Sequence, residues 1–478
     1  MDMTTLSVKD YHNAIEKGEI TVKALVTYYL DRIKKYDKQL HAIICINDSV
    51  LEQAQILDDH YSEFGFKGIL HGVPVLVKDN VNTKDMATTA GSKSLEGFIP
   101  DKNAKIIEKM CEAGALIIAK VNLHEFAIWG ETISSILGQT YNPYDLTRTP
   151  GGSSGGTGAS VAADFGMIGI GTDTINSIRS PASANCLVGI RPTVGLVSKE
   201  GVVPYSYTQD AIGPIARSVL DAAYFLEAVK KDYVDVDGQE IKTPNFTNHL
   251  LKDGLKGKTI GVLKDFFGHD QIHETTNQAL KKAVEMMEVQ GAKVVDVNDS
   301  IDSDQLVSEV SVHLYDLKDH LNEYLKSLNS NAPVHSFEEI MASGKYHPGI
   351  KENLIKASTL STQSDEYKVR CEKRKEVQAF LFKLMDQYNL DALVYPHQKR
   401  LVCKVGGSQK ERNGVLASVT GFPSICLPAG FSESDENAPI GVPIGMEILG
   451  RPFSEAKLIE IAYAFEQVAQ IRKNPVLE

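Results

Sequence analysis

Two serines and one lysine have the types and surroundings from which an acyl-transfer site can be built. Ser153 lies in the run GGSSGG, Ser177 lies in GTDTINSIR, and Lys78 ends the apolar run VPVLVK. A serine hydroxyl becomes a nucleophile at neutral pH when a base takes its proton, and a lysine can be that base once burial has lowered its usual pKa of about 10.4. The three residues together predict attack by a serine oxygen on a carbonyl carbon.

The segments around these residues carry a family resemblance. The stretch from Asn142 to Gly156, the stretch from Gly171 to Ala182 and the VKDN sequence resemble the amidase signature family, whose members hydrolyse amides through a Ser–cis-Ser–Lys triad. The resemblance extends more loosely over residues 6–466. It implies a small-molecule amide substrate and no metal or organic cofactor.

The resemblance assigns a role to each part of the motif. It makes Ser177 the nucleophile, Lys78 the base and Ser153 the proton relay that follows a cis peptide bond. Further roles fall to the oxyanion-hole backbone of Thr174, Ile175, Asn176 and Ser177, to substrate contacts at Gly152 and Thr172, and to supporting residues Ser154, Asp173 and Arg179. Consecutive N–H groups in a turn after the strand predicted at 167–171 can point at one developing oxyanion. We also expect Asp173 and Arg179 to form a buried pair that braces this turn.

One pair of residues departs from the family pattern. Most members carry Gly-Gly before the nucleophile, whereas this chain has Ile175 and Asn176. Glycine adopts positive φ without cost, and a β-branched isoleucine does not. We favour a backbone that keeps negative φ at Ile175 and packs its side chain. The alternatives are altered specificity or a degenerate, non-catalytic protein with the amidase fold.

Two other functions compete with that of a stand-alone amidase. The run Gly151–Gly155 also fits GxSxG, but a nucleophile elbow must follow a strand, and NPYDLTRTP precedes it here. Within the family, the rival is the glutaminase subunit of a tRNA-dependent amidotransferase. The segments SPASANCLVGIRPT and VPIGMEILGRPFSEAKLIEIAYAFEQ are more similar to stand-alone, aryl-acylamidase-like enzymes.

Composition narrows the class of protein further. A formal net charge of −12 over 478 residues disfavours sequence-independent nucleic-acid binding. The sequence has no apolar run of about 18 residues and no signal-peptide pattern at its start, so we expect no membrane span and a cytoplasmic protein. The six cysteines lack CxxC spacing and fit a reducing compartment. The oligomeric state stays open, a homo-oligomer included.

Alternating buried strands and helices predict the α/β class, with a single large mixed sheet covered by helices on both faces. We expect one domain over residues 1–478, with a helical region at 1–65, a signature core at about 66–225 and a second α/β lobe at about 258–478. We also predict one long helix over 303–328. The polar stretch 329–361 is expected to cover the active site.

Overall fold

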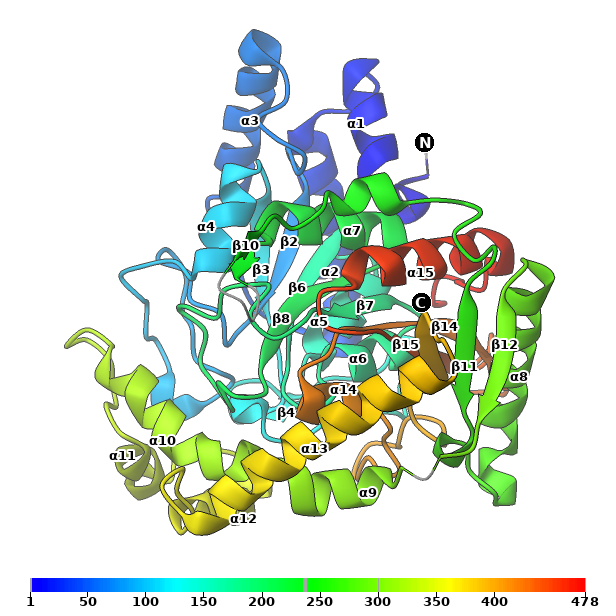
Figure 1. The fold of residues 1–478 in the computed structure, drawn as a ribbon. Coiled ribbons are helices and arrows are strands. Elements are labelled where there is room, and N and C mark those ends of the chain that lie inside the picture. Colours follow the sequence, from blue (N-terminus) through cyan, green and yellow to red (C-terminus); the bar gives the residue numbers. More distant parts are fainter. Residues whose placement is uncertain (1, 235–238, 300, 478) are drawn as a thin grey trace.

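An eleven-stranded mixed sheet runs through the molecule (Figure 1). The computed structural model describes residues 2–234, 239–299 and 301–477. In the order in which they pair, the strands are β1 (Ile43–Ile46), β3 (Leu116–Val121), β2 (Pro74–Lys78), β6 (Ile168–Asp173), β8 (Ala211–Ala216), β7 (Val188–Arg191), β14 (Ser424–Phe431), β15 (Pro443–Leu449), β13 (Ala392–Pro396), β11 (Thr259–Leu263) and β12 (Lys293–Val297). The predicted fold class is confirmed.

Two parallel groups of strands flank an antiparallel centre. Strands β3, β2 and β6 run parallel on one side, and β13, β11 and β12 run parallel on the other. The strands between them, β8, β7, β14 and β15, pair antiparallel. Every residue of β2, β6, β7, β8, β13 and β15 is buried, because helices cover both faces.

Fifteen α-helical segments lie around this sheet in the described part of the chain (Figure 1). They are α1 (Val8–Glu16), α2 (Val22–Leu40), α3 (Val50–Phe64), α4 (Lys105–Glu112), α5 (Gly155–Ala162), α6 (Arg179–Ala184), α7 (Val219–Val229), α8 (Glu274–Val289), α9 (Ser303–Gln305), α10 (His313–Lys326), α11 (Phe337–Ser343), α12 (Lys351–Ser358), α13 (Asp365–Gln387), α14 (Val415–Thr420) and α15 (Glu455–Ala469). Among the described residues, no helix has the length and apolar character that crossing a membrane requires.

The prediction of one long helix over 303–328 is wrong. The segment forms α9, a π-helical turn at Leu306–Val310 and then α10. The break is held by a distant side chain, because Gln209 Oε1 accepts hydrogen bonds from Val312 N at 2.7 Å and from Ser311 Oγ at 3.1 Å. Local sequence holds no glycine or proline that would signal this break.

Three strands of the large sheet have weak sequence signals, namely β1, β7 and β8. Proline is rarely found in a central strand because it cannot donate to the ladder, yet Pro214 lies in β8 between two neighbours. It pairs with Ile170 of β6, whereas β7 pairs only with Ile215 and Ala216 of the same strand. Pro214 therefore has no β7 residue opposite it, and its missing N–H removes no hydrogen bond between β8 and β7.

Candidate active site

The ends of two parallel strands bring the candidate residues together. Strands β2 and β6 are neighbours, with Val77 opposite Ile170. Lys78 is the last residue of β2, and Asp173 is the last residue of β6, so both leave the sheet at the same edge. The turn that carries Ser177 follows β6 directly and ends where α6 begins.

Lys78 and Ser153 are in direct contact. Lys78 Nζ lies 2.7 Å from Ser153 Oγ and 2.8 Å from Thr172 Oγ1. Thr172 Oγ1 also accepts a hydrogen bond of 3.1 Å from Asn80 Nδ2. The peptide bond between Gly152 and Ser153 is cis. The lysine amine is thus held between two hydroxyl oxygens.

The surroundings of Lys78 favour its neutral form. Its side chain is wholly buried. Burial lowers the pKa of Lys78 to about 7, and attraction to Asp173 and Asp210 opposes this shift only in part. An amine with such a pKa is largely able to accept a proton just above neutral pH.

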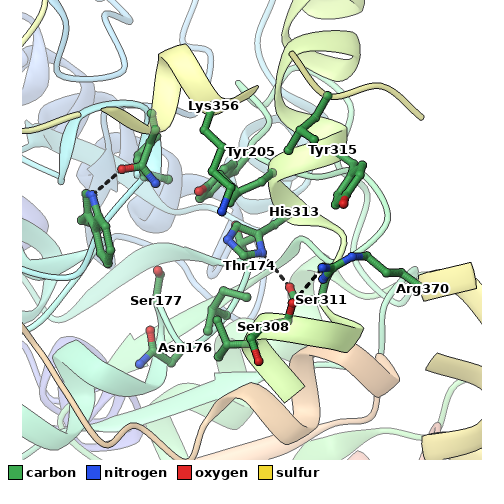
Figure 2. Close-up of a pocket in the computed structure, with 18 of the residues that line it drawn as sticks. Thr174, Asn176, Ser177, Tyr205, Ser308, Ser311, His313, Tyr315, Lys356 and Arg370 are labelled. Atoms are coloured by element: carbon green, nitrogen blue, oxygen red, sulfur yellow. Dashed lines mark hydrogen bonds between the residues drawn. The ribbon is translucent and has the colours of Figure 1, made fainter. Parts of the chain in front are cut away.

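Ser177 lies at the wall of a cavity of about 560 Å³. Figure 2 shows Ser177 and Asn176 on one side of this space, with Lys356 and His313 reaching in from the other. The backbone N–H of Ser154 donates to the carbonyl oxygen of Ser177 at 3.3 Å, which ties the two serine loops together. No hydrogen bond joins the Ser177 and Ser153 hydroxyls among the described residues.

The turn before Ser177 offers free backbone donors. Within the described chain, the N–H groups of Ile175, Asn176 and Ser177 donate to no other group, and all three residues line the cavity. The carbonyl of Ile175 points the other way, because it accepts hydrogen bonds from Ser418 Oγ at 2.6 Å and from Arg179 Nη2 at 2.8 Å. This arrangement can stabilise an oxyanion formed beside Ser177.

The Ile175-Asn176 pair fits the turn without backbone strain. Neither residue has positive φ. The Ile175 side chain is half-buried and packs against an apolar cluster that includes Val415 and Leu416. The Asn176 side chain is buried, and its Nδ2 atom has no hydrogen-bond partner in the described structure. The favoured expectation for Ile175 therefore agrees with the backbone seen here.

A buried charge network fixes the base of this turn. Arg179 forms two hydrogen bonds of 3.0 Å to the carboxylate of Asp173, and its Nη1 atom donates to Glu447 Oε2 of β15 at 2.7 Å. Arg191 also pairs with Asp173, at 2.9 Å. Burial alone would raise the pKa of Asp173, but Arg179 and Arg191 hold it below its usual range. All four side chains are excluded from solvent.

Comparison with known proteins identifies the family of this chain. A family model described as Amidase matches residues 24–459. The chain belongs to the amidase family. It is 35% identical to a probable amidase of Arabidopsis thaliana, over 98% of this chain and 91% of that protein. It is 31% identical to a glutamyl-tRNA(Gln) amidotransferase subunit of Caldanaerobacter subterraneus subsp. tengcongensis, over 99% of both.

A solved structure supports the same assignment. The chain superposes on the native peptide amidase of Stenotrophomonas maltophilia with a TM-score of 0.89 and 32% identity, and 99% of each chain is covered. The protein is therefore an amidase-family hydrolase that acts on amides.

Two residues expected to touch substrate in this amidase have close contacts within the protein. Thr172 is buried and turns its hydroxyl to Lys78, and Gly152 is packed against Gly130 and Thr132. Neither residue lines the cavity. Ser154 Oγ accepts from the backbone N–H of Thr172 at 3.3 Å and donates to its carbonyl oxygen at 3.2 Å, so it links the GGSSGG loop to β6.

Several cavity residues were not found from the sequence. They come from segments outside the motif and include Trp129, Tyr205, His313, Lys356, Arg370 and Arg412. The stretch 329–361, expected to cover the site, contributes Glu352, Asn353, Lys356 and Leu360 to the cavity wall. Asn80, which donates to Thr172 Oγ1, could have been found from the sequence. It belongs to the VKDN segment that contains Lys78.

Arg179→Met is expected to lower the free energy of unfolding by about 3–5 kcal/mol, because it leaves Glu447 buried without its cation and weakens the pairing of Asp173. Urea denaturation followed by circular dichroism measures this loss. Arg451→Met is the matched control, since the Arg451–Asp386 pair is largely exposed and should contribute less than about 1 kcal/mol. Equal effects of the two substitutions would contradict a bracing role for Arg179.

Proposed function

We propose that this chain is a stand-alone amidase that hydrolyses a carboxylic amide to an acid and ammonia or an amine. The observation that carries the proposal is the contact of 2.7 Å between the buried Lys78 amine and Ser153 Oγ, behind a cavity whose wall includes Ser177. A binding protein needs no buried amine with a pKa near neutrality.

The proposed cycle begins with proton transfer. Neutral Lys78 takes the proton of Ser153, and Ser153 takes the proton of Ser177. The Ser177 oxygen then attacks the carbonyl carbon of the amide and forms a tetrahedral intermediate. The N–H groups of the turn at 174–177 stabilise its oxyanion.

Collapse of the intermediate breaks the C–N bond. The proton held by Lys78 returns through Ser153 to the leaving nitrogen, which departs as ammonia or an amine. Water then attacks the acyl-enzyme, with the same relay accepting its proton. The carboxylic acid leaves and the Ser177 hydroxyl is restored.

The glutaminase subunit of a tRNA-dependent amidotransferase is the second candidate. The identity of 31% to an amidotransferase subunit, over 99% of both chains, favours it. The higher identity of 35% to a probable amidase and the TM-score of 0.89 with a peptide amidase support a stand-alone enzyme. A glutaminase subunit would hydrolyse glutamine in preference to other amides and would copurify with partner subunits.

Labelling with a fluorophosphonate tests whether the site is active. We expect one adduct, mapped by peptide mass spectrometry to Ser177, because this reagent reacts with activated serines. Ser308 is an internal control, since it lines the same cavity but donates its hydroxyl hydrogen to Asp304 O. Hydrolysis of a panel of amides, including glutamine and acylated anilines, then ranks the two candidates. A folded protein without an adduct would support the degenerate, non-catalytic alternative.

A further inference from the structure

The cavity beside Ser177 contains an arginine without a partner. Arg412 lines this cavity and is half-buried. Its guanidinium makes no hydrogen bond and no ion pair with any residue that the structure describes. A guanidinium has five N–H donors and stays charged at neutral pH, so a partly buried one without acceptors is costly to the free protein.

Arg412 lies close to the loop that carries Ser153. A β-carbon built on Gly130 would be 3.5 Å from Arg412 Nη1 and 3.9 Å from the carbonyl oxygen of Gly152. Gly152 immediately precedes Ser153 in the chain. A group bound by Arg412 would therefore lie in the cavity whose wall includes Ser177.

A second polar group on the cavity wall has no partner. The Tyr205 hydroxyl is buried and unsatisfied, and its ring packs edge-on against His313 at a centroid distance of 5.2 Å. Burial, followed by repulsion from Arg412, Arg370 and Lys356, lowers the pKa of His313 to about 3. His313 is thus neutral, and the cations around it make this part of the cavity attractive to an anion.

The two acidic residues of the cavity wall, Glu352 and Glu366, form no ion pair with Arg412 in the described structure. Arg370 is satisfied by the carbonyls of Ser308 at 2.7 Å and Ser311 at 3.1 Å, and it pairs with Glu366. Glu131 exerts the strongest attraction on Arg412 but forms no ion pair with it in the described structure. The Glu131 carboxylate accepts instead from the backbone N–H groups of Gly130 and Gln409.

We infer that Arg412, with the unpaired Tyr205 hydroxyl on the same cavity wall, forms a subsite for a carboxylate group carried by the amide substrate. A carboxylate supplies the planar pair of acceptors that a guanidinium binds with two parallel hydrogen bonds. The substrate class is then an amide with a carboxylate elsewhere in the molecule. The statement that this molecule is hydrolysed rests on the proposed function. The binding of its carboxylate by Arg412 does not.

Protection of Ser177 from fluorophosphonate labelling tests the subsite on the full-length protein. One competitor pair places the carboxylate on the acyl side, glutaric acid monoanilide against pentananilide. The other places it on the amine side, N-acetyl-β-alanine against N-acetylpropylamine. We expect the charged member of at least one pair to halve the labelling rate at a concentration about 10- to 100-fold lower than its neutral counterpart.

Arg412→Gln should reduce that discrimination to less than about threefold, and Arg412→Lys should retain part of it. Lys356→Gln is the matched control, because the exposed Lys356 lines the same cavity without the guanidinium fork. If a diffuse positive field rather than contact were responsible, Lys356→Gln would match Arg412→Gln, and the inference would be overturned. Melting temperatures show whether each variant is folded. If Arg412→Gln does not fold, the comparison is made with Arg412→Lys instead.

The outcomes separate the two proposals. Equal protection by both members of both pairs in the wild type, or discrimination that survives Arg412→Gln, overturns the carboxylate subsite and leaves the amidase intact. Absence of any adduct on Ser177 counts against the proposed function instead. The competitor pairs are then titrated calorimetrically against the same folded protein. The ratio of the dissociation constants of the neutral and charged members then decides whether the subsite exists.

Discussion

Ser177→Ala is expected to lower kcat/KM for any amide substrate by about 10⁴- to 10⁶-fold. Losses of this size follow removal of a serine nucleophile, because the remaining oxyanion donors and binding contacts supply only a small part of the rate. The measurement is amide hydrolysis under single-turnover and steady-state conditions, with fluorophosphonate labelling on the same sample. The adduct should disappear together with the activity.

A structural effect must be separated from this chemical one. Ser177 is buried, but its hydroxyl makes no hydrogen bond within the described residues, so alanine should leave the melting temperature within a few degrees. Ser62→Ala is the control, since Ser62 is an exposed serine on α3 that only donates to the Asp58 carbonyl. A Ser177→Ala protein with near-normal turnover would refute the assignment of the nucleophile.

Lys78→Met is expected to cost about 10²- to 10⁴-fold in kcat/KM, the usual contribution of a positioned general base. It should lower the melting temperature only slightly, because the loss of the contacts to Ser153 and Thr172 is offset by removal of an amine whose protonated form is disfavoured by burial. Lys120→Met is a matched comparison on the neighbouring strand β3. Lys120 is equally buried but pairs with Asp79 and donates to Val81 O and Thr88 Oγ1, so its loss should destabilise the fold.

The pH dependence gives an independent test of the same role. Since the pKa of Lys78 is lowered to about 7, the neutral amine dominates above this value and the ammonium below it. We expect kcat/KM to level off at alkaline pH and to fall about tenfold for each pH unit below about 7. A flat profile down to about pH 5 would contradict a lysine base.

The motif predicted the centre of the site because its residues follow buried strands. VPVLVK and GMIGIGTD are apolar runs, and their parallel pairing places Lys78 and Asp173 at one edge of the sheet. Strands β11 and β12 have the same character, since each is a short, mostly apolar run that follows a polar turn. Most strands of this sheet can be recognised in the sequence as apolar runs between polar turns.

The cavity wall could not be predicted, because its shape depends on tertiary contacts. Arg412 lies in a polar stretch without a periodic pattern, and its guanidinium reaches the cavity wall near Gly130, which is far away in the sequence. The break between α9 and α10, which places His313 in the cavity, depends on the distant Gln209. A single sequence gives no signal for either contact.

The bracing of the nucleophile turn also has a consequence for the order in which the chain is made. Lys78, Ser153 and Ser177 leave the ribosome early, but Arg179 reaches its partner Glu447 only 268 residues later. At about 5–20 residues per second, tens of seconds pass during which the turn is made but not braced. A nascent chain therefore holds all three candidate catalytic side chains long before it can hold them in working geometry, and hydrolysis should begin only when synthesis is nearly finished.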